Sequence, residues 1–128
     1  IVAKRILKNM DIYDLAQAAK EMTEAGREKE LIELHYAQDA ILLEAIDLGQ
    51  GRRFEGKKAI ADYRLGLKAS FDVKKVQVST PKMHAPDQFG LILTFDAVDK
   101  MTKSADEISF VAVYTVSDGM ISSERVFM

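Results

Sequence analysis

The most informative stretch of the chain is residues 40–46, Ala-Ile-Leu-Leu-Glu-Ala-Ile. Its aliphatic and β-branched side chains are typical of a strand that is apolar on both faces, so we expect a buried strand here. Successive side chains of a strand point to opposite faces, which puts Glu44 on the same face as Leu42 and Ile46. The sequence therefore predicts a carboxylate on an aliphatic strand face.

Helical periodicity precedes this strand. Apolar residues recur at three- and four-residue steps over residues 11–25, which predicts a helix with one buried stripe. Gly26 follows at the position where a left-handed backbone is least costly, so we expect the helix to end there. A second, short helix is expected over residues 27–36, with Leu34 and His35 turned inward.

One more helix and a series of strands are expected downstream. Gly56 begins a helix in which Ile60, Tyr63 and Leu67 recur at helical spacing. Strands with two-residue alternation are expected at residues 71–80, 89–98, 108–117 and 120–128. This order of elements predicts an α+β fold in which helices cover one face of a sheet.

Two local signals refine this assignment. The Asp118-Gly119 pair tolerates positive φ and predicts a tight hairpin before the last strand. His84 lies between Pro81 and Pro86 and is expected in a loop.

Length and composition limit the classes of function. The 128 residues suit a single domain, residues 1–128, in which residues 1–10 either extend the first helix or form a loose arm. Twenty acidic and 18 basic residues give a net charge of -2, which disfavours nucleic acid as a partner. Cysteine is absent and there are two histidines, so neither a metal nor another cofactor is expected.

Charged residues interrupt every apolar run before it reaches the roughly 18 residues that would cross a bilayer, so no membrane partner is expected. The first eight residues mix three cations among apolar side chains and lack the continuous core of a secretory signal. We expect a cytoplasmic protein, although a sequence that starts at Ile1 leaves export open.

Three segments together resemble a known superfamily. They are Tyr-Ala-Gln-Asp-Ala-Ile-Leu-Leu-Glu at residues 36–44, Phe-Glu-Gly-Lys-Lys-Ala-Ile at residues 54–60, and Asp-Gly-Met-Ile at 118–121 with Arg-Val-Phe at 125–127. Their order and spacing resemble the nuclear transport factor two-like superfamily, which includes ketosteroid isomerases and SnoaL-like polyketide cyclases. The resemblance implies a cone, in which a strongly bent mixed or antiparallel sheet wraps around about three helices and encloses an apolar pocket.

The resemblance also implies chemistry for Glu44, because this residue falls at the offset of the proton-transferring aspartate of ketosteroid isomerases. A carboxylate removed from water is a better proton acceptor near neutral pH. Glu124 is a second, weaker candidate acid. Alternation in the last strand leaves two alternatives for it, either a pocket wall or a solvated position beside Arg125.

Candidate ligand-binding residues follow from the same faces and comprise Leu42, Tyr63, Leu67, Ala112, Tyr114 and His35. The alternative for the tyrosines is that they only pack in the wall of the pocket. The alternative for His35 is a structural packing position at the end of a helix, with its polar atoms hydrogen-bonded. The two oxyanion donors of ketosteroid isomerases would fall near Ala19 and Ala112, which carry no polar group. A true ketosteroid isomerase is therefore not expected.

Two functional hypotheses remain open. In the first, the protein binds a small apolar molecule and acts as an isomerase, dehydratase or cyclase with Glu44 as general base. In the second, it is a noncatalytic ligand-binding or dimerisation module. In either case apolar residues remain on both faces of the strands at 89–98 and 108–117, which favours a homodimer through the exposed sheet face.

Overall fold

The computed structural model describes residues 11–128, and the arm expected over residues 1–10 lies outside this range. The described helices are α2 (Ile12–Glu24), α3 (Glu28–His35) and α4 (Lys57–Ser70). The strands are β1 (Tyr36–Leu43), β2 (Arg53–Glu55), β3 (Phe71–Val78), β4 (Lys82–Ala85), β5 (Gln88–Asp99), β6 (Ala105–Ser117) and β7 (Met120–Phe127). None of these three helices is both long and apolar enough to cross a membrane.

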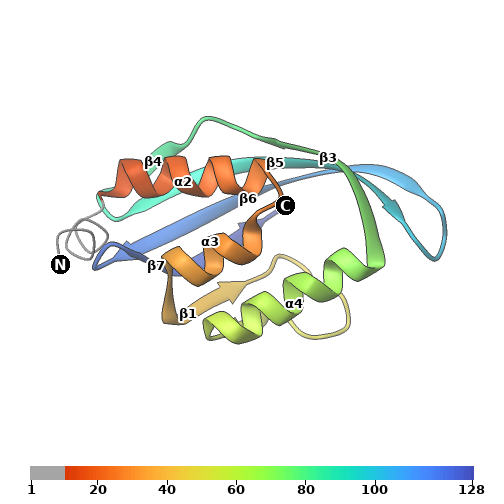
Figure 1. Ribbon diagram of the computed structural model, residues 1–128, viewed down its shortest axis with the longest axis horizontal. Coiled ribbons are helices and arrows are strands. Elements are labelled where there is room, and N and C mark those ends of the chain that lie inside the picture. The colour runs from red at the N-terminus through yellow and green to blue at the C-terminus, as the bar shows by residue number, and fades with distance from the viewer. Residues whose placement is uncertain (1–10) are drawn as a thin grey trace.

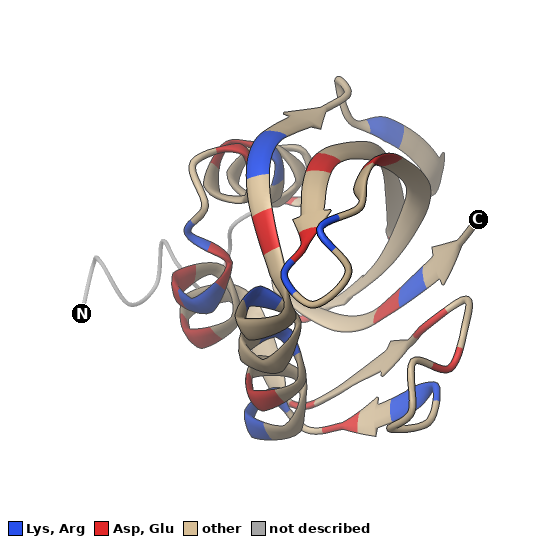
Figure 2. Ribbon diagram, turned by 90° about the vertical axis from the view of Figure 1, so that its right-hand side faces the viewer, with Lys and Arg blue, Asp and Glu red and all other residues tan. Residues whose placement is uncertain are grey.

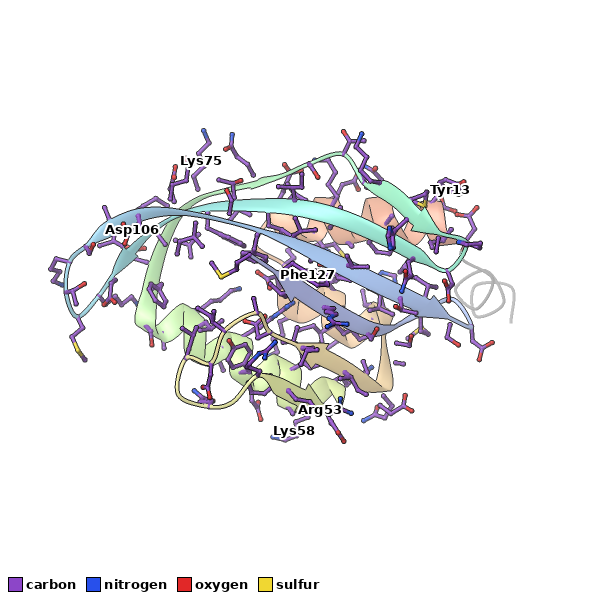
Figure 3. The ribbon with its side chains drawn as sticks, turned by 180° about the vertical axis from the view of Figure 1, so that it is seen from behind. Tyr13, Arg53, Lys58, Lys75, Asp106 and Phe127 are labelled. Carbon is purple, nitrogen blue, oxygen red and sulfur yellow. The ribbon has the colours of Figure 1, made fainter. Side chains whose placement is uncertain are left out.

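The strands form one open sheet of seven strands in the order β2-β1-β7-β6-β5-β3, with β4 paired to β5. β1 and β7 run parallel and the other pairs are antiparallel, so the sheet is mixed. Figures 1 and 3, which view the molecule from opposite sides, show the three helices on one face of the sheet. The α+β class, with a mixed sheet and three helices, is confirmed.

The core forms between the helices and the inner face of this sheet. Alternation in β5 buries Phe89, Leu91 and Leu93 and leaves Ile92 half exposed on the other face. The helices contribute apolar stripes, of which all but Ile32 are predicted from the sequence, comprising Leu15, Ala16, Ala19, Met22, Leu31, Ile32 and Ile60. Charged residues of both signs are interspersed along the ribbon (Figure 2).

Two predicted chain reversals use left-handed backbone. Gly26 has a φ of 73° and ends α2, where the Arg27 amide donates to the Met22 carbonyl at 2.8 Å. Asp118 and Gly119 have φ values of 52° and 73°, and the flanking residues Ser117 and Met120 pair across the hairpin. Both reversals are confirmed, because these residue types tolerate positive φ at little cost.

The strand expected over residues 40–46 is shifted toward the N-terminus. β1 already begins at Tyr36, directly after α3, and it ends at Leu43. Beyond it the Asp47 carboxylate accepts hydrogen bonds from the Gly49 and Gly51 amides at 2.7 and 2.9 Å. This turn pulls the chain away from the sheet, so Ile46 is 48% exposed instead of buried.

Two smaller expectations were wrong, and the last strand departs from strict alternation. Leu34 is 56% exposed because Ile32 takes the inward position of α3. His84 lies in the short strand β4, since an edge strand that pairs on one side tolerates flanking prolines. Ile121 is buried like Glu124, because a register shift in the β6–β7 pair interrupts the alternation of the last strand.

Leu42 offers a test of the core packing. Its side chain is fully buried, so Leu42→Ala should lower the free energy of unfolding by about 3 kcal/mol through lost burial and a residual cavity. Leu65→Ala, at a position of α4 that is 67% exposed, should change it by no more than about 0.5 kcal/mol. Urea unfolding followed by circular dichroism measures both values, and equal losses would contradict the packing described here.

Candidate functional site

A row of inward-facing side chains crosses the middle of the sheet. The register pairs Leu42 of β1 with Glu124 of β7, Glu124 with Tyr114 of β6, and Tyr114 with Phe89 of β5. The rings of Phe89 and Tyr114 stack with their centroids 4.8 Å apart. Glu124 thus lies inside an otherwise apolar and aromatic row, and only 2% of its surface is exposed.

Glu124 is the acceptor at the centre of a buried polar cluster. The Tyr36 hydroxyl donates to Oε1 of Glu124, and Nη2 of Arg64 donates to Oε2 at 2.6 Å. Arg64 also lies 3.4 Å from a carboxylate oxygen of Glu28. We call Tyr36, Arg64, Glu124 and Glu28 the inner cluster. It joins β1, α4, β7 and α3 at one point.

The charges of the inner cluster compensate one another. Burial is the largest single influence on Arg64 and disfavours its charged form, but Glu124, Tyr36 and Glu28 together outweigh it, so the pKa of the guanidinium lies above its usual value. Burial raises the pKa of Tyr36, and the negative charge of Glu124 raises it further. The same two causes raise the pKa of Tyr114 above its ordinary value. Both phenols therefore stay protonated at neutral pH.

A second polar group lies where β1 ends. The Tyr63 hydroxyl of α4 donates to Oε2 of Glu44 at 2.8 Å. Tyr63 is 5% exposed and stacks on Phe54 of β2 with the centroids 4.0 Å apart. Glu44 itself is partly exposed. Burial, followed by the hydrogen bond to Glu44, raises the pKa of Tyr63. We call these two residues the Glu44–Tyr63 pair.

The candidate residues therefore gather in two places and not in one. Leu42, Ala112 and Tyr114 lie on the buried inner face with Glu124, whereas Tyr63 lies with Glu44. Leu67 is partly buried further along α4. His35 is 8% exposed at the end of α3, and burial lowers its pKa, so its imidazole is neutral at pH 7.

A hollow of about 320 Å³ opens on the other side of the end of β1. It is lined by Leu43, Ala45, Ile46, Arg52, Arg125, Val126, Phe127 and Met128. Glu44 is not among the residues that line it. An apolar pocket beside Glu44 stays a prediction. No group of acidic and histidine side chains within residues 11–128 could hold a metal ion.

Comparison with solved structures gives the fold family. A candidate SnoaL-like polyketide cyclase from Mesorhizobium loti superposes with a TM-score of 0.86 and 28% identity over 93% of this chain and 100% of that one. This chain has the fold of the nuclear transport factor two-like superfamily. No protein-family model and no curated protein matches it.

Two further superfamily structures share the fold at lower identity. A candidate isomerase from Bacillus subtilis has a TM-score of 0.75 at 20% identity, covering 91% of this chain and 88% of that one. A Mycobacterium tuberculosis protein in complex with estradiol-17beta-hemisuccinate has a TM-score of 0.69 at 18% identity, with 89% and 90% covered.

Sequence reasoning missed Arg64 and Glu28, although a signal for Arg64 was present. Ile60, Tyr63 and Leu67 mark the buried stripe of α4, and Arg64 occupies the remaining i+4 position of that stripe. A cation at such a position requires a buried acidic partner. In this structure that partner is Glu124, the acid for which the sequence left both a buried and a solvated position open.

Tyr36 gives the inner cluster a measurable dependence on pH. Its pKa is raised in the folded protein, so above about pH 10 the unfolded chain loses this proton first and is stabilised by doing so. The stability that Tyr36 contributes is therefore complete below about pH 10 and declines as the pH rises further. Tyr36→Phe should cost most stability near neutral pH and progressively less at higher pH.

Urea unfolding of both proteins between about pH 8 and about pH 11 measures this difference. Tyr13 and Tyr63 are common to the two proteins, so their ionisation cancels in the comparison, whereas the ionisation of Tyr114 is linked to that of Tyr36 and follows it. A difference that stays constant across the range would contradict a protonated, buried Tyr36 hydroxyl.

Proposed function

We propose that this protein binds a small, mostly apolar molecule next to the Glu44–Tyr63 pair, and that the Glu44 carboxylate accepts a hydrogen bond or a proton from it. The observation that carries the proposal is the 2.8 Å hydrogen bond from Tyr63 to one oxygen of Glu44. It orients a partly exposed carboxylate whose other oxygen receives no hydrogen bond from residues 11–128. That oxygen is available to a ligand.

Glu124 is less suited to this role. Tyr36 and Arg64 already occupy both of its oxygens, and its side chain is buried. A proton transferred to Glu124 would leave Arg64 with only the partly exposed Glu28 carboxylate, 3.4 Å away, as its counterion, which is costly. The geometry therefore favours a positioning role for Glu124 and leaves Glu44 as the acceptor.

Solved superfamily structures support a small-molecule ligand with an apolar body. The Mycobacterium tuberculosis protein holds estradiol-17beta-hemisuccinate, whose steroid skeleton is almost entirely apolar. In the present chain the stacked Phe54 and Tyr63 rings beside Glu44 supply an aromatic surface of matching character.

A noncatalytic role is the second candidate, and the buried alanines favour it. Ala19 and Ala112 stand where the resemblance puts the oxyanion donors of ketosteroid isomerases, and both are fully buried. Neither can donate to an enolate, and a missing oxyanion contact costs roughly 3 kcal/mol of transition-state stabilisation. Ligand binding without turnover, in a cytoplasmic protein, is consistent with this arrangement.

Estradiol is a suitable probe, because it has an apolar body and a phenolic hydroxyl that can donate to a carboxylate. Glu44→Gln should weaken its binding by about tenfold, since a hydrogen bond to a charged acceptor is lost. Isothermal titration calorimetry measures the affinity. Glu55→Gln is the matched control, because Glu55 pairs with Arg53 at the outer edge of the same sheet and should leave binding unchanged. Equal affinities for wild type and Glu44→Gln would exclude Glu44 as the acceptor.

We also propose a homodimer through the sheet face that turns away from the helices. Ile92, Val111 and Phe127 lie side by side across β5, β6 and β7 and are 51%, 38% and 44% exposed. Such a row of exposed apolar side chains suits contact with a second copy. Val111→Glu should shift the sedimentation coefficient from dimer to monomer, whereas Leu65→Glu on exposed α4 should not. A wild-type protein that stays monomeric at all concentrations would refute the dimer.

A further inference from the structure

We propose that the hollow at the ends of β1 and β7 is a second binding site, for a small carboxylate with an apolar body. It is separate from the Glu44–Tyr63 pair, and of its lining only Phe127 also belongs to the proposed dimer face. The hollow measures about 320 Å³, at the lower end of the range for small-molecule sites. Two arginines and several apolar side chains line the hollow.

The hollow is cationic in a protein whose net charge is negative. Its lining contains Arg52 and Arg125 and no acidic residue. Neither guanidinium forms an ion pair with any carboxylate of residues 11–128. Hydrogen bonds from the Gly49 and Gly51 amides are the main cause of the lowered pKa of Asp47, and the charge of Arg52 makes a smaller contribution in the same direction, so Arg52 has a carboxylate nearby. The charge of Arg125 is therefore less compensated by nearby carboxylates than that of Arg52.

Both arginines are held in place before any ligand arrives. Nε of Arg52 donates to the Glu44 carbonyl oxygen at 3.0 Å, which fixes the side chain and leaves its terminal nitrogens available. The guanidinium of Arg125 lies 5.2 Å from the centroid of the Phe127 ring, a cation–π contact. Arginine suits carboxylate recognition because its donors match the two oxygens in geometry.

The remaining lining selects for an apolar body. Leu43 pairs with Arg125 across the parallel β1–β7 contact, so an aliphatic side chain lies directly beside the cation. Ile46, Phe127 and Met128 are 48%, 44% and 71% exposed around the hollow. Phe127 is labelled in Figure 3, on the face away from the helices. A charged ligand without an apolar body would leave this apolar surface exposed to water. An uncharged apolar ligand would leave the two arginines without a counterion.

Octanoate tests the proposal, because it joins one carboxylate to a short apolar chain. A titration of the isotope-labelled full chain, followed by amide chemical shifts, should shift residues around Leu43, Ala45 and Phe127. 1-Octanol, which lacks the charge, and acetate, which lacks the apolar body, should each bind at least about tenfold more weakly. Amides beside Tyr63 should not move, which separates this site from the proposed one.

Arginine variants test the recognition directly. Arg52→Gln and Arg125→Gln should each weaken octanoate binding by about tenfold, since each removes a charge-assisted hydrogen bond. Arg53→Gln is the matched control, because Arg53 is bonded to Glu55 and does not line the hollow. Both lining arginines are exposed, so the fold should persist, and a circular dichroism spectrum verifies this. Arg125→Lys gives the same comparison if the glutamine variant does not fold.

Three results would overturn the proposal. They are the absence of octanoate binding, equal affinity for octanoate and 1-octanol, and octanoate affinity unchanged in both arginine variants. Shifts of the same amides with protein concentration, in the absence of octanoate binding, would assign the hollow to contact between copies instead.

Discussion

The Glu124 carboxylate is held from two sides inside the fold, by the Arg64 guanidinium of α4 and by the Tyr36 hydroxyl at the start of β1. Tyr36 and Glu124 are buried and the side chain of Arg64 is only 16% exposed, so each depends on the others for compensation of its charge or polarity. Removing one partner from such a pair typically costs about 3–5 kcal/mol, because a charge is left buried without a counterion. The inner cluster therefore fixes how β1, β7 and α4 fit together, more strictly than apolar packing alone could.

This constraint reaches the candidate site through α4. Tyr63 and Arg64 are consecutive residues, so the ion pair of Arg64 with Glu124 also sets the rotation of the helix that presents the Tyr63 hydroxyl. The same contact sets the distance between α4 and the end of β1, where Glu44 lies. One buried polar cluster thus positions the exposed one. We infer that Glu124 acts on any ligand chemistry only through this geometry.

Much of the fold could be predicted from local patterns, because local chemistry determines those features. Gly26 and Asp118-Gly119 sit where only residues that tolerate positive φ fit well, and period-two alternation marks β5 and β6. The end of β1 could not be predicted, since Ala45 and Ile46 continue the aliphatic sequence of β1 and only the Asp47 turn removes them from the sheet. Alternation and residue type alone do not show whether the strand continues or the turn begins.

The site was harder to predict for a related reason. Alternation assigned Glu124 to a face, but which face is buried depends on the partner that a distant helix supplies. Arg64 is that partner, and it lies 60 residues away along the chain. The family resemblance drew attention to Glu44 and helical spacing to Tyr63, whose hydrogen bond is present, but neither gave any indication of the cationic hollow at the end of β1.

The parallel pairing of β1 with β7 has a consequence for how the protein is made. β1 is synthesised early, yet its neighbour in the sheet is formed by residues 120–127, and the antiparallel β5–β6–β7 meander cannot dock onto it before these residues emerge from the ribosome. Until then Leu42 and the stripe of α4 lack their covering strand, and Arg64 has no counterion in Glu124. Nascent chains should therefore expose an apolar surface with an unpaired charge until β7 has been synthesised, and chaperones recognise surfaces of this kind.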